Sequence, residues 1–237
     1  PMRPWSDRPI QDCLESLEHL PPQLFRIEPH PYASVGAPYG QGKDPFRLRS
    51  GVVRRLLQAQ NQLRHRAPEL RFAIFDAWRP ISVQAFMVNY TIDQLCRERG
   101  VDRDDPRQAV DLQTVESDVG RFWAPPSRNP QTPPPHSTGA AVDLTLATDA
   151  GELLAMGSPI DAIGAVSEPD VFANASDPAE QLFHQRRDLL RTVMASAGFA
   201  QHPNEWWHYS YGDQLWAWRS GAEAAIYAEA GSNSATP

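Results

Sequence analysis

Cysteine is scarce in this sequence of 237 residues, which contains only Cys13 and Cys96. Neither residue lies in a spacing that is typical of a metal-binding or redox pair. The sequence therefore offers no disulfide framework and no thiolate metal site. We expect both cysteines to be packing thiols.

Basic clusters and long apolar runs are lacking as well. The formal net charge is −7, and because phosphate binding needs concentrated Lys and Arg, nucleic acid is not an expected partner. No apolar run approaches the ~20 residues that span a bilayer, so no membrane partner is expected. Residues 1–7 lack the basic and then apolar profile of a signal peptide, and for a chain without a removed leader the cytoplasm is the expected location.

The order of helical and strand patterns is that of an α+β protein. Because no βαβ unit repeats, we expect a central antiparallel or mixed sheet flanked by helices, in a single compact domain over residues 1–230. Residues 231–237 have the composition of a disordered tail. Helices are predicted at 51–63, 80–99 and 185–197, and strands at 70–75, 140–146 and 206–211.

Individual residues predict where several of these elements begin or end. Ser50 is the expected N-cap of the first helix. Pro80 suits the first position of the second helix, and Gly100 is expected to end it. Residues 124–135 hold too many prolines for a regular element and are predicted to be a loop.

Two short segments carry the chemistry of this chain, His136 to Asp143 and Glu205 to His208. They supply two imidazoles, one carboxylate and a spare Glu. This is the inventory of a hydrolytic zinc site with an open fourth position, although the same ligands also accept other divalent ions. The pattern indicates metal-assisted hydrolysis rather than structural metal binding.

Strand periodicity places the candidate ligands in space. In the segment 140–146, Asp143 faces away from Val142 and Leu144, which are expected to face the core. In a regular strand Glu205 and His208 would face opposite sides. We therefore predict that Glu205 lies at the beginning of its strand or that a bulge intervenes.

Three separated motifs in this order resemble a known family. The segment from His136 to Asp143, the Glu-Trp-Trp-His quartet that ends at His208, and Asp76-Ala-Trp-Arg-Pro80 are similar to the signatures of the zinc D-alanyl-D-alanine dipeptidases of the VanX type, peptidase family M15. The similarity runs from about Tyr32 to Tyr211 and implies the same α+β fold, with the zinc site on the sheet.

The resemblance also implies roles for individual residues. His136, Asp143 and His208 would bind one Zn²⁺ per chain. Glu205 would be the general base and then the general acid, and Arg79 would stabilise the tetrahedral oxyanion. The implied activity is hydrolysis of D-alanyl-D-alanine to two molecules of D-alanine.

Two further positions are implied to bind the substrate. Asp161 and Tyr32 match family residues near the free ammonium of the dipeptide. Pro134 stands where the family has a Ser whose hydroxyl lies near the substrate, and proline has no such donor. The dipeptide preference is therefore open.

Several alternatives stay open at this point. Asp76 and Arg79 could form an ion pair at the start of a helix without any part in catalysis. The chain could be a related peptidoglycan D,D- or L,D-carboxypeptidase or endopeptidase, or a zinc-stabilised module that binds without catalysis. Among the other histidines only His202, which is near the motif, is expected to lie beside the site. The physiological role and the oligomeric state are not indicated.

Overall fold

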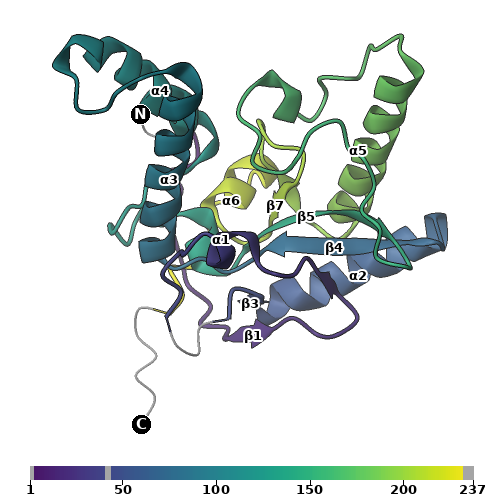
Figure 1. The fold of residues 1–237 in the computed structure, drawn as a ribbon. Coiled ribbons are helices and arrows are strands. Elements are labelled where there is room, and N and C mark those ends of the chain that lie inside the picture. Colours follow the sequence, from purple (N-terminus) through teal and green to yellow (C-terminus); the bar gives the residue numbers. More distant parts are fainter. Residues whose placement is uncertain (1–2, 41–43, 232–237) are drawn as a thin grey trace.

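A five-stranded mixed sheet is the centre of the fold in the computed structural model, which describes residues 3–40 and 44–231 (Figure 1). The strand order is β2-β4-β5-β7-β6, with β2 parallel to β4 and all other neighbours antiparallel. The strands are β2 (Phe25–Arg26), β4 (Leu70–Asp76), β5 (Ala141–Thr148), β7 (His208–Ser210) and β6 (Ala200–Gln201). The predicted α+β class with a mixed sheet is confirmed.

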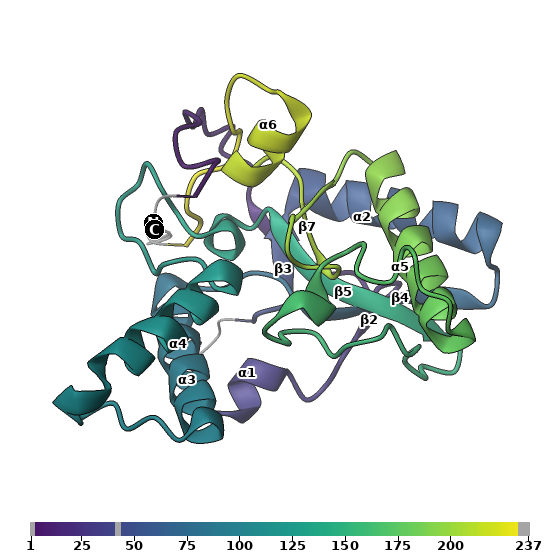
Figure 2. The ribbon, with the colours of Figure 1, turned by 90° about the horizontal axis from the view of Figure 1, so that it is seen from above.

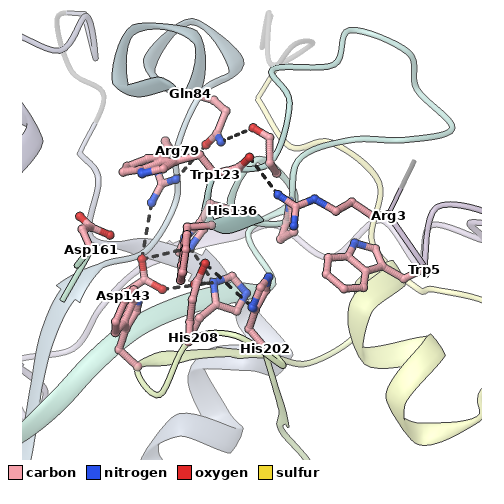
Figure 3. Close-up of a pocket in the computed structure, with 15 residues that line it drawn as sticks. Arg3, Trp5, Arg79, Gln84, Trp123, His136, Asp143, Asp161, His202 and His208 are labelled. Atoms are coloured by element: carbon pink, nitrogen blue, oxygen red, sulfur yellow. Dashed lines mark hydrogen bonds and ion pairs between the residues drawn. The ribbon is translucent and has the colours of Figure 1, made fainter. Parts of the chain in front are cut away.

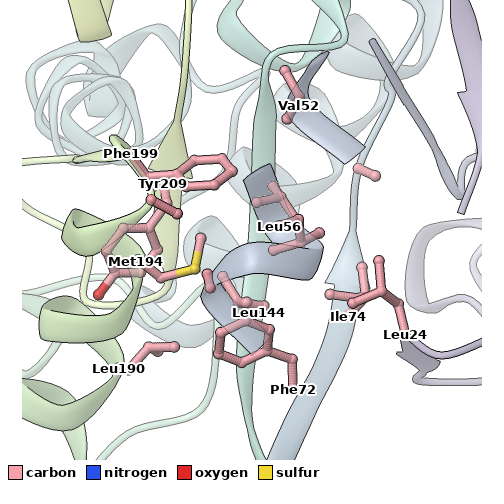
Figure 4. Close-up of a cluster of buried hydrophobic side chains, with 14 of the residues drawn as sticks. Leu24, Val52, Leu56, Phe72, Ile74, Leu144, Leu190, Met194, Phe199 and Tyr209 are labelled. Carbon is pink, nitrogen blue, oxygen red and sulfur yellow. The ribbon is translucent and has the colours of Figure 1, made fainter. Parts of the chain in front are cut away.

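One face of the sheet is covered by two long helices, α2 (Ser50–Arg66) and α5 (Pro178–Ser196) (Figure 2). Leu144 of β5 packs there with Leu56 of α2 and Leu190 of α5, all fully buried (Figure 4). Val142, Leu144 and Leu146 belong to this apolar cluster, so β5 turns its alternate residues, including Asp143, toward the opposite face. The predicted facing of this strand is confirmed.

A second apolar cluster joins α3 (Ile81–Arg99) to α4 (Ala109–Phe122). These two helices lie side by side at one end of the sheet, beside the short helix α1 (Pro31–Ser34) (Figures 1 and 2). A small antiparallel pair, β1 (Leu17–His19) with β3 (Arg47–Arg49), leads directly into α2. The last helix is α6 (Gln214–Ser220).

The predicted helix boundaries are correct in part. Helix α3 ends at Gly100, which has the predicted left-handed conformation (φ 67°), and Pro80 is its N-cap rather than its first residue. The prediction that Ser50 caps α2 is wrong. The N-cap is Arg49, which is the last residue of β3, so the preceding strand fixes where this helix begins.

Other predicted elements differ more from the structure. Helix α5 begins at Pro178, well before the predicted residue 185, because Asp177 caps it by accepting hydrogen bonds from two backbone amides. The strand predicted over 206–211 is limited to His208–Ser210. The amide of Trp206 donates to the carbonyl of Ser167 rather than to a neighbouring strand. Helices α4 and α6 have no counterpart among the predicted elements.

Three further expectations can be compared with the fold. Cys96 is buried as predicted, but Cys13 is exposed, so the prediction that it is a packing thiol is wrong. The predicted tail 231–237 falls outside the described residues, apart from Gly231. Within the described part of the chain, no helix is both long enough and apolar enough to cross a membrane.

Candidate metal centre

Two neighbouring strands and one turn bring the predicted ligands together. Asp143 of β5 pairs directly with His208 of β7 in the antiparallel register. His136 lies in the 3₁₀ helix η2 (Pro135–Thr138), which follows the proline-rich loop. Gly139 then reverses the chain in a left-handed conformation (φ 74°) and returns it to β5. The long sequence separation between the ligands is closed by sheet pairing.

The three side chains converge on one point in a buried cavity (Figure 3). His136 Nε2 lies 3.2 Å from Asp143 Oδ2, and His208 Nδ1 lies 3.2 Å from Asp143 Oδ1. The two imidazole nitrogens are also 3.2 Å apart. The ligand atoms of all three residues lie within 4.8 Å of one another, which is the arrangement expected around a metal ion.

The hydrogen bonds around these side chains fit a cation at their centre. His136 Nδ1 donates to the carbonyl of Ala77 at 2.7 Å, so in the neutral ring Nε2 is left with a lone pair directed at Asp143 and His208. Asp143 Oδ1 is buried and makes no hydrogen bond of regular geometry. When the lone pairs of these nitrogen and oxygen atoms face one another, they repel. A positive ion bound between them would remove this repulsion.

Local electrostatics keep the ligands in the forms that bind metals. Burial acts to raise the pKa of Asp143, but His136 and His208 outweigh it and hold that pKa well below its usual range. Burial lowers the pKa of His208, which favours the neutral imidazole. Asp143 is therefore an anion and His208 a neutral imidazole near neutral pH, which are the forms that bind metals.

Glu205 lies in the connection between β6 and β7, three residues before β7 begins, so it is outside the regular strand and the alternation that would turn it away from His208 does not apply. Its Oε2 is 3.7 Å from His208 Nδ1, and its Oε1 is 3.9 Å from His202 Nδ1. The residue is 5 % exposed. Burial, followed by the charges of Asp143 and Asp161, raises its pKa well above the usual value. Glu205 is thus a carboxyl with a raised pKa beside the candidate metal ligands.

Arg79 enters the cavity from the segment between β4 and α3. It forms the buried ion pair with Asp76 that the sequence left as an alternative, with Nη2 2.7 Å from Asp76 Oδ2. Its Nη1 donates to Gln84 Oε1 at 2.8 Å, and its Nη2 is 3.5 Å from Asp143 Oδ2. The guanidinium also lies over the ring of Tyr32, 4.9 Å from the ring centroid. The ion pair and the candidate metal ligands are therefore parts of one network.

Asp161 and Tyr32 lie next to this network and contact each other. Tyr32 donates a hydrogen bond of 2.7 Å to Asp161 Oδ2. Burial, together with the charge of Asp143, raises the pKa of Asp161 to about 7. The backbone of Asp161 is left-handed (φ 68°), a conformation that Asp tolerates better than most residues. The carboxyl is thus held on one side of the cavity, where a cation would favour its ionised form.

Comparison with known proteins identifies the family. The family model for D-ala-D-ala dipeptidases, Peptidase M15, matches residues 26–226. The chain is 45% identical over 228 residues to a D-alanyl-D-alanine dipeptidase of Synechocystis sp., covering 92% of this chain and 91% of that protein. The chain belongs to the D-Ala-D-Ala dipeptidase family. The family predicted from the sequence motifs is confirmed. Membership of this family supports the prediction that the protein is a hydrolase.

Two further matches share less sequence with this chain. A D-alanyl-D-alanine dipeptidase of Escherichia coli is 31% identical over 140 residues, which cover 59% of this chain and 54% of that one. The solved structure of VanYB in complex with D-alanine-D-alanine is 15% identical, with a TM-score of 0.43, and the match covers 74% of this chain and 78% of that chain.

The structure adds residues around this dipeptidase-family site that the motifs did not indicate. His30 Nε2 donates a buried hydrogen bond of 2.8 Å to Asp76 Oδ1, so this histidine, which the sequence did not single out, supports the carboxylate that pairs with Arg79. His202, expected beside the site, lines the cavity. Trp207 lines it too, and Arg3 and Trp5 reach it from the N-terminal segment. Periodicity carries no signal for contacts between such distant segments.

Proposed function

We propose that this protein is a zinc dipeptidase that hydrolyses D-alanyl-D-alanine to two molecules of D-alanine. The observation that carries the proposal is the convergence of His136, Asp143 and His208 in a buried cavity, with Glu205 beside them. Membership of the D-Ala-D-Ala dipeptidase family supports the substrate.

Zinc is the proposed cofactor, with one ion per chain held by His136, Asp143 and His208. Two imidazoles and one carboxylate are a typical ligand set of catalytic zinc, and they leave a position for water or substrate. When bound, zinc supplies the positive charge that makes a water acidic near neutral pH and polarises the scissile carbonyl.

Glu205 is the proposed general base and general acid. Its side chain is close to the proposed ligands, with Oε2 3.7 Å from His208 Nδ1, and His136, Asp143 and His208 already supply three ligands. Its raised pKa suits a group that takes a proton from the attacking water and returns it to the leaving amine.

Arg79 is the proposed stabiliser of the oxyanion. Its guanidinium lines the cavity, is held rigidly by Asp76 and Gln84, and stays charged at every working pH. Because its donors are fixed before the reaction, little reorganisation is required as negative charge develops on the substrate.

Asp161 and Tyr32 are proposed to hold the free ammonium of the dipeptide. The ammonium would pair with the Asp161 carboxylate, and Tyr32 fixes the orientation of that carboxylate through the 2.7 Å hydrogen bond. A buried carboxyl whose pKa is about 7 becomes fully ionised when a cation binds beside it.

The experiment is a hydrolysis assay on zinc-loaded protein with D-Ala-D-Ala, together with the Glu205→Gln variant. We expect wild-type turnover, and a loss of ~10²–10⁴ in kcat for Glu205→Gln at unchanged zinc content. Wild-type protein that holds one zinc ion but does not cleave the dipeptide would overturn the proposal.

N-acetyl-D-Ala-D-Ala separates a dipeptidase from a carboxypeptidase. This compound lacks the ammonium that Asp161 is proposed to bind, so a dipeptidase should cleave it poorly. If the acetylated compound were the better substrate, the protein would instead act on longer peptides such as the peptidoglycan stem.

A further inference from the structure

The N-terminal segment forms one wall of the cavity. Trp5 is 5 % exposed and packs edge-on against His202, with ring centroids 5.4 Å apart. Arg3, two residues earlier, also lines the cavity and is half-buried. Both residues therefore lie within reach of a molecule bound beside Glu205.

Arg3 is held in place by the end of helix α4. Its guanidinium donates to the carbonyls of Gly120 (2.6 Å), Arg121 (3.1 Å) and Trp123 (2.9 Å). These are free carbonyls at a helix C-terminus, where a cation is favoured. An Arg side chain has five N–H donors, so this anchoring leaves two for another acceptor.

Opposite charges lie on opposite sides of the metal ligands. In Figure 3, Asp161 is on one side of Asp143, His136 and His208, and Arg3 is on the other. Among the described residues that line the cavity, the guanidinium groups are those of Arg3 and Arg79. Arg79 is already paired with Asp76 and hydrogen-bonded to Gln84.

This distribution of charge matches that of an unblocked dipeptide. Such a molecule carries an ammonium at one end and a carboxylate at the other, with the scissile bond between them. If the ammonium lies at Asp161 and the carbonyl at the metal ligands, the carboxylate extends toward Arg3.

We propose that Arg3 is a specificity-determining residue that binds the terminal carboxylate of the dipeptide. The inference rests on the proposed dipeptidase function and adds the recognition of the second charged end. Arg3 contacts the substrate away from the reacting atoms, so its main effect is on binding, and it selects substrates whose carboxylate is free.

The electrostatic setting supports this role. Burial lowers the pKa of Arg3, and the charge of Glu205 opposes that change, which places Arg3 and Glu205 within electrostatic range of each other. A charge-assisted hydrogen bond in such a partly desolvated place is stronger than one on the open surface.

The test compares D-Ala-D-Ala with D-Ala-D-alaninamide, which lacks the negative charge and is otherwise nearly identical. For the zinc-loaded wild type we expect kcat/KM to be roughly 10- to 100-fold lower for the amide, mostly through KM. Arg3→Gln should lose a similar factor on the dipeptide and little on the amide, so that the two substrates become nearly equal. Arg3→Lys, which keeps the charge, should restore part of the preference.

Arg121→Gln is the matched control, because it removes an exposed positive charge from the same helix end and leaves the backbone carbonyl that accepts from Arg3. This variant should keep the wild-type preference between the two substrates. A purely structural role of Arg3 as a helix cap would lower the melting temperature and reduce the activity on both substrates by the same factor.

The outcomes separate the two proposals. A wild type that cleaves neither substrate would reject the dipeptidase function itself. A wild type that cleaves the dipeptide, with a preference over the amide that Arg3→Gln leaves unchanged, would reject only the role of Arg3. If Arg3→Gln did not fold, a smaller preference in Arg3→Lys than in Arg121→Gln would support the role, and the full wild-type preference in Arg3→Lys would reject it. Equal cleavage of both substrates by the wild type would also reject the role of Arg3.

Discussion

Asp76 and Asp143 lie opposite each other on the neighbouring strands β4 and β5, and both carboxylates are almost completely buried. Two like charges in this position repel each other. Arg79 lies between them, with Nη2 2.7 Å from Asp76 Oδ2 and 3.5 Å from Asp143 Oδ2. The pairing register shifts between Ile74 and Asp76, which allows both carboxylates to reach the guanidinium. Arg79 therefore stabilises the site, in addition to the catalytic role proposed for it.

Replacing Arg79 by Met should destabilise the fold strongly. The substitution keeps much of the side-chain volume but leaves two buried carboxylates without their cation, which typically costs about 3–5 kcal/mol. Urea unfolding of metal-free protein measures this change. Arg191→Met is the control, because Arg191 pairs with Asp170 and Asp188 on the surface and should contribute only ~0–1 kcal/mol. Equal losses in the two variants would contradict the buried network.

Metal removal should lower the melting temperature of the wild type. An ion that binds only the folded state at 100 times its Kd stabilises it by about 2.7 kcal/mol. Dipicolinate should therefore shift the transition downward, and added zinc should restore it. In His208→Ala the chelator should have little effect. His65→Ala, which changes an exposed histidine far from the cavity, should respond to the chelator as the wild type does.

The carboxyl of Asp161 should make metal-free protein less stable as the pH rises. Its pKa is about 7 in the fold, against about 3.9 in an unfolded chain. Between these values the folded state holds the proton and the unfolded state has released it, so the free energy of unfolding falls with increasing pH. The stabilisation is complete below about pH 4 and is lost by about pH 7.

Asp161→Asn should remove this contribution. The free energy of unfolding of the variant, measured with urea between pH 4 and 8, should fall less steeply than that of the wild type. Parallel curves for the two proteins would mean that the pKa of Asp161 is not raised in the folded protein. The pKa of Glu205 is raised mainly by burial, which both proteins share, and the loss of the Asp161 charge lowers it in the variant, which flattens the curve of the variant in the same direction.

Gly139→Ala, in the turn between His136 and β5, should destabilise the protein more than Gly100→Ala, a substitution at another left-handed glycine. Both Gly139 and Gly100 have positive φ, which costs a non-glycine residue about 1–2 kcal/mol. A Cβ at Gly139 would in addition overlap the side chain of Leu17, whereas one at Gly100 would meet nothing within 4 Å. Thermal unfolding should show a larger loss for Gly139→Ala, and zinc affinity should fall only there. A loss equal to that of Gly100→Ala would contradict the packing argument.

The sequence by itself determined those features that depend only on residues within one element. The alternation of Val142, Leu144 and Leu146 fixes which face of β5 carries Asp143, because successive side chains in a strand point to opposite sides. Gly100 ends α3 for an equally local reason, its tolerance of positive φ. The spacing of the chemistry-bearing residues also sufficed to predict the family.

Only the tertiary structure decided which distant segments meet. Asp143 and His208 become neighbours through strand pairing, and Arg3 reaches the end of α4, more than a hundred residues along the chain, through three backbone carbonyls. A contact between distant segments also makes β7 shorter than the predicted strand 206–211, since the amide of Trp206 donates to the carbonyl of Ser167. Hydrophobic periodicity describes the face of a single element. Periodicity does not identify the element that packs against that face. The free energy that selects this partner is gained only when the whole core is assembled.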